Sequence, residues 1–231
     1  LRLPEREHDP FSVIQAVEWA RRAGFDNLNL DLIFGIPGQS MATWEHSLHL
    51  ALGLKPEHLS LYALTIEHGT PFKKWLERGL IESPDDDLAA EQYEYACQLL
   101  DEASYEHYEI SNWAFRRGGH SLVCRHNLQY WKYLPYIGIG AGAHGFLQNH
   151  RTVNVRGIKA YITRVTSNFK MPQPASSAAE QVIELDLWTQ MQEKMMVGLR
   201  LLEEGVEEHS FEEQFGLKME DVFGKQINRL I

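Results

Sequence analysis

Hydrophobic and polar positions follow two different periods along the chain, and each change of period marks a predicted element. Apolar spacings of three and four residues are typical of helices, and short alternating runs are typical of strands. The predicted helices span residues 11–23, 40–52, 71–78, 85–103 and 157–166, and the predicted strands span residues 27–34, 59–66 and 105–110. The first four elements alternate between helix and strand, with connections too long for hairpins, which indicates parallel βα units and an α/β fold.

Local signals set the ends of two of these helices. Asp9-Pro10 supplies a cap and a first-turn proline for the first helix, and Gly24 is placed to end it. Ser83-Pro84 is expected to cap the helix over 85–103. The acidic triplet 85–87 that follows fits a first helical turn, where carboxylates interact favourably with the helix dipole, better than it fits a metal site.

The C-terminal part begins with a linker and continues as helices. Residues 172–177 read PQPASS, the best linker candidate in the chain. Beyond it, apolar residues recur at every fourth position of one long predicted helix, at Ile183, Leu187, Met191, Met195 and Leu199. Shorter helical stretches follow at 210–215 and 219–230. We therefore expect a first domain over residues 1–171 and the start of a small, mainly α-helical domain over residues 172–231.

The predicted strand over 27–34 has polar residues where a buried parallel strand has apolar ones. In Asn27-Leu28-Asn29-Leu30-Asp31-Leu32 every second residue is polar, whereas parallel strands are usually covered on both faces. One explanation is a half-exposed antiparallel strand. The other is an α/β sheet or barrel whose inner face holds a ligand while Leu28, Leu30 and Leu32 pack outward on helices. In that case Asp31 faces the ligand site and accepts hydrogen bonds from an amine or a ribose hydroxyl.

Composition describes a globular protein without obvious membrane or export signals. The chain has 231 residues, 44% of them hydrophobic, and no apolar run of the length that spans a bilayer. No signal-peptide core is present at residues 1–5, so we expect a cytoplasmic location. The two cysteines, Cys97 and Cys124, lie 27 positions apart and predict neither a disulfide framework nor an autonomous metal site.

Charge is distributed unevenly. The net charge of −10 argues against a protein that binds nucleic-acid backbones. Between residues 110 and 179 there is no Asp or Glu, and this cationic block carries nine basic residues, namely Arg116, Arg117, Arg125, Lys132, Arg151, Arg156, Lys159, Arg164 and Lys170. Such a block attracts a small anionic ligand. The alternative is a basic surface that docks on acidic parts of the same protein.

A glycine run inside this block resembles a nucleotide-binding loop only superficially. Residues 140–145, GAGAHG, match G-x-G-x-x-G, but no capped helix follows, and the next acidic residue is Glu180. The dinucleotide fingerprint requires both features, so that interpretation is rejected. Alternating glycines indicate instead a backbone closely approached by another stretch of chain or by a flat ligand.

The residues just before the glycines favour a porphyrin ligand. His126 lies in the cationic block near four aromatic residues whose faces can stack on a planar macrocycle, namely Trp113, Tyr130, Trp131 and Tyr133. Imidazole is a common axial ligand of haem iron, and basic residues suit the propionates. His126 is therefore the candidate ligand to haem iron. His120 and His144 are weaker candidates, and Cys124 is as well explained as a small apolar residue.

Several ordered blocks resemble the HemN/HemW family of radical S-adenosylmethionine proteins. They are DLIFGIPGQ at 31–39, LSLYALTIE at 59–67, YEISNWA at 108–114, RHNLQYW at 125–131 and GIGAGAHG at 138–145. The resemblance implies the C-terminal part of a radical S-adenosylmethionine partial (β/α)6 barrel followed by a small mainly α C-terminal domain.

The resemblance also implies cofactors and site residues. In this family Asp31 would contact S-adenosylmethionine from the fifth barrel strand, and Thr65 would lie beside the same ligand at the end of the sixth. HNLQY fits the H-N-x-x-Y motif implicated in haem binding by the HemW haem chaperones, which brings in His126, Asn127 and Tyr130. The oxidases of the family hold a second S-adenosylmethionine at positions occupied here by Leu128, Gln129 and His144.

One family feature is missing. The family holds a [4Fe–4S] cluster on a C-x-x-x-C-x-x-C loop, and this sequence has no such loop. We therefore expect a fragment that begins past the cluster loop and the first four strands, and that is inactive by itself in reductive cleavage of S-adenosylmethionine.

The resemblance favours a haem chaperone that passes haem to haem-requiring proteins. The alternatives are an oxygen-independent coproporphyrinogen III oxidase and a radical enzyme with an unrelated substrate. Whether the acceptor is membrane-associated, and whether the protein forms a homodimer, stays open at this point.

Overall fold

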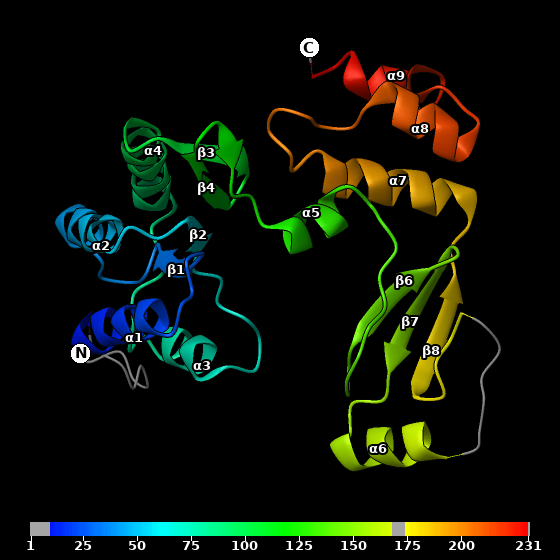
Figure 1. Cartoon of the computed structure of the whole chain (residues 1–231), viewed down its shortest axis with the longest axis horizontal. Coiled ribbons are helices and arrows are strands. Elements are labelled where there is room, and N and C mark those ends of the chain that lie inside the picture. Colours follow the sequence, from blue (N-terminus) through cyan, green and yellow to red (C-terminus); the bar gives the residue numbers. More distant parts are fainter. Residues whose placement is uncertain (1–9, 168–173, 231) are drawn as a thin grey trace. The chain divides into compact units, whose positions relative to one another are not determined.

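The computed structural model describes residues 10–167 and 174–230, and the chain divides into two compact units, residues 1–124 and residues 125–231. The elements of the first unit are α1 (Pro10–Arg22), β1 (Asn29–Phe34), α2 (Met41–Gly53), β2 (His58–Ala63), α3 (Pro71–Glu77), α4 (Asp86–Glu102), β3 (Tyr105–Glu109), β4 (Asn112–Arg117) and β5 (His120–Ser121) (Figure 1). The elements of the second unit are α5 (Arg125–Trp131), β6 (His144–Leu147), β7 (His150–Asn154), α6 (Ile158–Thr166), β8 (Ala179–Glu184), α7 (Leu187–Gly198), α8 (Glu208–Phe215) and α9 (Met219–Ile227).

The first unit contains a mixed sheet with the strand order β1-β2-β4-β3, and β5 pairs with β4. β1 and β2 are parallel and are joined through α2, which confirms the predicted βα units and excludes the antiparallel alternative for β1. β4 is antiparallel to each of the three strands that it pairs with, β2, β3 and β5, and a tight turn joins it to β3. The parallel βα pattern therefore does not continue past β2.

One face of this sheet carries the hydrophobic core, which α2 and α4 cover (Figure 1). Leu30 and Leu32 pack into this core, as expected, whereas Leu28 lies before the strand. Trp44 of α2 is 1% exposed, and its indole nitrogen donates to the Gln92 carbonyl of α4 at 2.8 Å. Burial of apolar side chains, at about 1.5–3 kcal/mol each, is the main stabilisation of this face.

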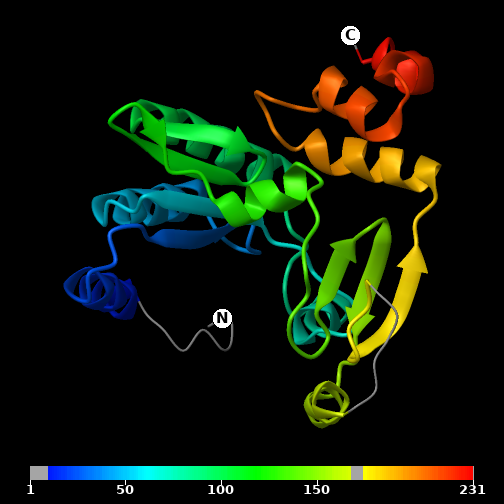
Figure 2. The ribbon, with the colours of Figure 1, turned by 45° about the vertical axis from the view of Figure 1, so that its right-hand side comes forward.

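The second unit joins a small antiparallel sheet, β6-β7-β8, to a group of helices. Figure 2 shows α7, α8 and α9 beyond one end of this sheet and α6 at its other end. Met191 of α7 packs with Phe211, Phe215 and Phe223 in a core of its own.

Three predicted boundaries are wrong. Ile183 belongs to β8 and not to the long helix, because Asp186 accepts a hydrogen bond from the Thr189 amide and starts α7 at Leu187. Asp85, and not Ser83-Pro84, caps α4, since its carboxylate accepts from the Leu88 amide. The second strand ends at Ala63, three residues before the predicted end.

Some predictions concern residues outside the described part of the chain. These are the Asp9 cap and the first two residues of the predicted linker, 172 and 173. The boundary between residues 171 and 172 lies in the same undescribed segment, and the two predicted domains stay a prediction. The acidic turn at 85–87 is confirmed as the start of α4.

Within residues 10–167 and 174–230, no helix combines the length and the apolar composition needed to cross a bilayer.

Glu57 connects three separate segments of the first unit. It is 5% exposed, and its carboxylate accepts hydrogen bonds from Arg21 of α1 at 2.7 Å, from the Leu28 amide at 2.9 Å and from Arg117 of β4 at 2.7 Å. Burial by itself raises the pKa of Glu57, but these hydrogen bonds outweigh it and hold the pKa below 4.5. The carboxylate therefore stabilises the folded state in its charged form.

We predict that Glu57→Gln lowers the free energy of unfolding at pH 7 by about 1.5–3 kcal/mol, the range for hydrogen bonds to a charged group. Because the pKa is lower in the folded chain, this stabilisation is complete above the unfolded-state pKa of about 4.5 and is lost as the pH falls through the folded-state pKa. Urea unfolding at pH 7 and below pH 4 measures both effects. Glu91→Gln, at an exposed position of α4, is the control, and an equal loss in that variant would contradict the prediction.

Candidate functional site

The second face of the first unit's sheet is polar where β1 and β2 run side by side. Asn29 and Asp31 of β1 lie opposite His58 and Ser60 of β2 in the parallel register. Asn29 Nδ2 donates to Asp31 Oδ1 at 2.6 Å, and Asn29 Oδ1 lies 2.7 Å from His58 Nδ1 and 3.2 Å from Ser60 Oγ. The predicted polar face of β1 is therefore present, with Asp31 exposed on it.

His58 extends this polar network to a third strand. Its Nε2 lies 2.8 Å from the hydroxyl of Tyr108 on β3, and both side chains are buried, at 5% and 6% exposure. Burial lowers the pKa of His58 to about 4, although the nearby Asp31 carboxylate acts in the opposite direction. His58 is therefore neutral at neutral pH.

His58 and Tyr108 were missed by sequence reasoning. The signal was present, since His58-Leu59-Ser60-Leu61 alternates polar and apolar residues as Asn29-Leu30-Asp31-Leu32 does. Applying the same criterion to both strands would have found His58 and Ser60. Tyr108 could not be found in this way, because a bulge between His107 and Glu109 interrupts the strand period beside it.

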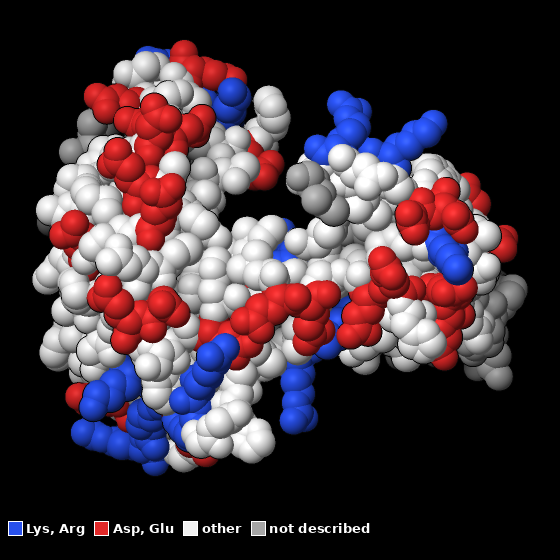
Figure 3. All heavy atoms as spheres, turned by 90° about the horizontal axis from the view of Figure 1, so that it is seen from above, with Lys and Arg blue, Asp and Glu red and all other residues white. Residues whose placement is uncertain are grey.

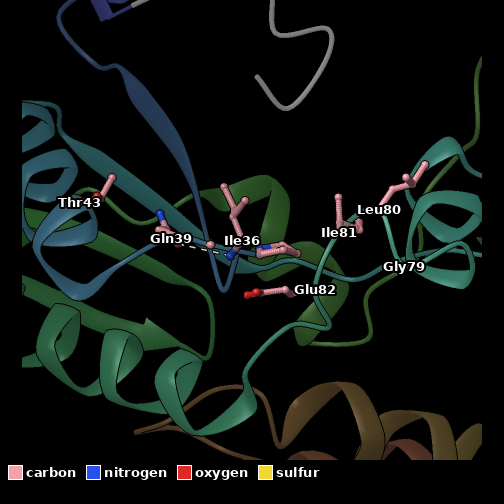
Figure 4. A pocket seen from close by; sticks show the side chains of 9 residues that line it. Ile36, Gln39, Thr43, Gly79, Leu80, Ile81 and Glu82 are labelled. Carbon is pink, nitrogen blue, oxygen red and sulfur yellow. Dashed lines mark hydrogen bonds between the residues drawn. The ribbon is translucent and has the colours of Figure 1, made fainter. Parts of the chain in front are cut away.

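Thr65 lies two residues past the end of β2 and is exposed, so it is a loop residue and not the end of a strand. A hollow of about 670 Å³ opens beside the turn that follows β1. The Ile36 amide donates to Gln39 Oε1 within this turn (Figure 4). The hollow is lined by Ile36, Pro37, Gly38, Gln39, Thr43, Gly79, Leu80, Ile81 and Glu82. The carboxyl ends of parallel strands are where α/β folds bind ligands.

A short helix, α5, presents the candidate histidine. The sequence did not predict this helix, although its spacing places His126 and Tyr130 one turn apart on one face. The Tyr130 hydroxyl lies 3.3 Å from His126 Nε2, and the two rings meet edge to face with centroids 5.0 Å apart. Tyr130 also contacts Tyr136 edge to face. His126 is exposed, so its imidazole is open to a ligand.

The other candidates of this unit occupy different settings. Asn127 and Gln129 are half-buried on α5, and Gln129 Nε2 donates to the Pro135 carbonyl at 2.6 Å. His144 is an exposed residue of β6, paired with Val153. The structure thus joins His126 to Tyr130 directly. Asp31 and Thr65 belong to the first unit.

Three of the four aromatic residues expected beside His126 are engaged elsewhere. Trp113 is fully buried in the first unit and stacks on His107 at 4.0 Å. Tyr133 is buried and donates to Glu193, and burial together with this carboxylate raises its pKa. Trp131 packs under the Arg200 guanidinium. Among the four, Tyr130 is the ring in contact with His126, so the predicted aromatic cluster is wrong for Trp113 and Tyr133.

In the glycine segment 138–145 the close approach lies at the two ends, Gly138 and Gly145, whereas Gly140 and Gly142 have positive φ angles and no close contact beside them. A Cβ on Gly138 would lie 2.2 Å from the His144 carbonyl oxygen, and one on Gly145 would lie 2.7 Å from Thr152 Oγ1. Asn154 Nδ2 holds the same loop through the carbonyls of Gly138 and Gly140, at 3.0 Å each. The run leads into strand β6 and not into a helix, which confirms the rejection of a dinucleotide loop.

Part of the cationic block neutralises acidic residues of the same chain. Four of its nine basic residues form ion pairs, namely Arg116 with Glu106, Arg117 with Glu57, Lys132 with Glu204 and Arg151 with Glu193. In the described part of the chain no ion pair is formed by Arg125, Arg156, Lys159 or Arg164. Acidic side chains are prominent on the face drawn in Figure 3. Pairing with acidic residues of the same protein therefore accounts for four of the nine basic residues of the cationic block.

The described residues contain no group of three or more His, Cys, Asp or Glu side chains arranged to hold a metal ion. Cys97 and Cys124 are free and half-buried. The chain's own cysteines therefore do not fit a [4Fe–4S] cluster.

Comparison with known proteins first identifies the class of fold. The structure is similar to the solved structure of the coproporphyrinogen III oxidase HemN from Escherichia coli, which is described as a radical SAM enzyme. The TM-score is 0.71 over 96% of this chain and 51% of that chain, at 18% identity. The fold is therefore that of a HemN-type radical S-adenosylmethionine protein. A sequence profile of the HemN C-terminal domain matches residues 185–231.

Sequence relatives then define the family. The chain is 37% identical to the haem chaperone HemW of Bacillus subtilis over 226 residues, 97% of this chain and 56% of that protein. It is 33% identical to the mitochondrial radical S-adenosyl methionine domain-containing protein 1 of Danio rerio, over 99% of this chain and 51% of that protein. The chain belongs to the HemN/HemW family, and it spans about half the length of these curated relatives.

We predict that Gly138→Ala destabilises the second unit by more than about 2 kcal/mol, because the added Cβ overlaps a backbone carbonyl that is held in the β6–β7 ladder. Thermal unfolding followed by circular dichroism measures the effect. Gly224→Ala is the control, since its Cβ meets the flexible side chain of Glu220 at an ordinary 3.5 Å and lies in helix α9. Equal melting temperatures for the two variants would contradict the close approach at Gly138.

Proposed function

We propose that the intact protein is a haem chaperone of the HemW type, which binds haem and passes it to haem-requiring proteins. The observation that carries this proposal is the exposed imidazole of His126, held one helical turn from Tyr130 in an H-N-x-x-Y pattern. The HemW relative from Bacillus subtilis, alignable over 97% of this chain, supports the same function.

The surroundings of His126 suit haem as a cargo. Tyr130 interacts with Nε2 of the ring, so Nδ1 is the nitrogen that we assign to the haem iron. Ligand histidines commonly have their second nitrogen hydrogen-bonded, which fixes the orientation of the ring. Arg125 is exposed beside His126 and supplies positive charge for a propionate. Tyr130 offers an aromatic edge beside the imidazole, and Asn127, Gln129 and His144 are secondary candidates for contact.

The polar strand face of the first unit is our candidate site for S-adenosylmethionine. Asp31 is exposed there and accepts hydrogen bonds, as the amine or the ribose hydroxyls of that cofactor require. Thr65 is exposed in the loop that follows β2. The two cysteines of this chain do not fit a [4Fe–4S] cluster, so we assign no step to that group.

A coproporphyrinogen III oxidase is the less supported alternative. The HemN structure shares the fold at 18% identity, whereas the HemW relative shares 37% of the aligned residues. An oxidase would also need a second S-adenosylmethionine near Gln129, whose amide is already bonded to the Pro135 carbonyl. Delivery to a haem-requiring acceptor protein and formation of a homodimer are parts of the same proposal.

We predict that His126→Ala abolishes the shift of the haem Soret band that the wild-type protein produces, because it removes the axial ligand. Absorbance titration with ferric haem measures the effect. Tyr130→Phe should weaken binding by about 2- to 10-fold, the equivalent of one hydrogen bond. His209→Ala, at an exposed position of α8, is the control and should titrate like the wild type.

An unchanged Soret shift in His126→Ala would exclude His126 as the ligand. Decarboxylation of coproporphyrinogen by the reduced intact protein would favour the oxidase instead.

A further inference from the structure

The directions of the hydrogen bonds around Asp31 follow from two premises, the acceptor-only chemistry of an ionised carboxylate and the neutral state of His58. An ionised carboxylate only accepts hydrogen bonds. The atom of Asn29 that lies 2.6 Å from Asp31 Oδ1 must therefore be its amide nitrogen, which leaves Asn29 Oδ1 as an acceptor on its other side. The orientation of the Asn29 amide is thus fixed by chemistry.

The same reasoning continues through His58. Asn29 Oδ1 only accepts, so His58 Nδ1, at 2.7 Å, must carry the ring proton and donate it. The neutral imidazole then has an acceptor at Nε2, and the Tyr108 hydroxyl at 2.8 Å must be the donor. Tyr108 donates to His58, His58 donates to Asn29, and Asn29 donates to Asp31. We call this chain of three hydrogen bonds the Tyr108–Asp31 relay.

The relay becomes more solvent-accessible towards Asp31. Tyr108 and His58 are 6% and 5% exposed, whereas Asn29 and Asp31 are exposed. Ser60 adds a second donor to Asn29 Oδ1 at 3.2 Å and is itself buried. Within the described part of the chain, no hydrogen bond reaches the other carboxylate oxygen, Asp31 Oδ2. The buried end therefore fixes one carboxylate oxygen, and Oδ2 remains for a ligand.

We propose that Asn29, His58 and Tyr108 are positioning residues, which orient Asp31 so that Oδ2 presents a fixed acceptor to a hydrogen-bond donor of S-adenosylmethionine. This inference rests on the proposed S-adenosylmethionine site. It adds the residues that hold one carboxylate oxygen of Asp31 and leave the other as an acceptor for the ligand. Hydrogen bonds that hold a carboxylate in place reduce the conformational entropy lost when the ligand binds.

The polarity of the relay selects the chemistry of the ligand. An acceptor at Oδ2 pairs with an ammonium group or a ribose hydroxyl and repels a carboxylate or phosphate. In Asp31→Asn the new amide would have to turn its oxygen to Asn29, so its NH2 group would face the ligand. That variant reverses the hydrogen bond as well as removing the charge.

The first test is spectroscopic and needs no ligand. In the intact protein with 15N-labelled histidine, we expect the neutral Nδ1–H tautomer for His58 at pH 7, assigned by its absence in His58→Gln. Tyr108→Phe removes the donor to Nε2 and should increase the Nε2–H tautomer. A wild-type His58 that is charged, or protonated at Nε2, would overturn the relay.

The second test measures S-adenosylmethionine binding by anaerobic calorimetry in the intact protein. Asp31→Asn should weaken binding by more than about 10-fold, and Tyr108→Phe and His58→Leu by about 2- to 10-fold. His58→Gln should bind like the wild type, because its amide can donate to Asn29 and accept from Tyr108. Tyr95→Phe removes a hydroxyl that lies 3.3 Å from His49 Nε2 on the helical side, and it is the matched control.

The outcomes separate the two proposals. A wild-type protein that does not bind S-adenosylmethionine overturns the proposed role of Asp31 and this inference with it. Loss of binding in Asp31→Asn, with wild-type affinity in both Tyr108→Phe and His58→Leu, overturns the positioning role alone. Melting temperatures of all variants establish that each is folded, and Tyr108→Phe, which removes a single oxygen atom, provides the test if His58→Leu is unfolded.

Discussion

The parallel pairing of β1 with β2 is the constraint on which the first unit depends. Successive side chains of a strand point to opposite faces, so the pairing in register divides both strands in the same way. The leucines of both strands enter the core beneath α2 and α4, and the residues between them form one polar surface. A shift of the register by one residue would turn the polar residues of one of the two strands, either Asp31 of β1 or His58 of β2, towards the hydrophobic core, and burial of unpaired polar groups is costly. The hydrophobic core therefore keeps the polar site in place.

In the first unit, the predictions from the sequence are correct where the alternation of apolar and polar residues along a strand agrees with the packing of the core. The alternation in β1 predicted both the leucine face and the exposed position of Asp31. The predictions failed where distant residues decide the outcome. Trp113 was expected near His126 because both lie in the cationic block, yet the antiparallel pairing of β4 with β2 places Trp113 opposite Leu59 in the core. A residue that lies near a candidate site in the sequence can therefore be buried in the core of a sheet.

In the second unit, some features could be predicted from short stretches of sequence and others could not. The glycines predicted a close backbone approach, which occurs at Gly138 and Gly145 but not at Gly140 and Gly142. The apolar residues at every fourth position predicted a start of α7 that is too early. The helix begins after Asp186, because its carboxylate caps the first turn, and the single apolar residue Ile183 does not extend the helix past this cap. Helix α5 is too short for a periodic signal, and its ends could not be predicted from spacing.

The two histidines of most interest differ in how they are held, and this difference argues for their different roles. His58 is buried, neutral, and bonded at both ring nitrogens within the first unit. A metal ion could approach neither nitrogen without breaking a hydrogen bond in a region closed to solvent. His126 is exposed, and the structure bonds it through Nε2 to a neighbour on its own helix, so binding at Nδ1 leaves that contact intact. Sequence composition treats these two residues alike, and their surroundings are what support the roles that we propose for them, His58 in orienting a carboxylate and His126 in binding a cargo.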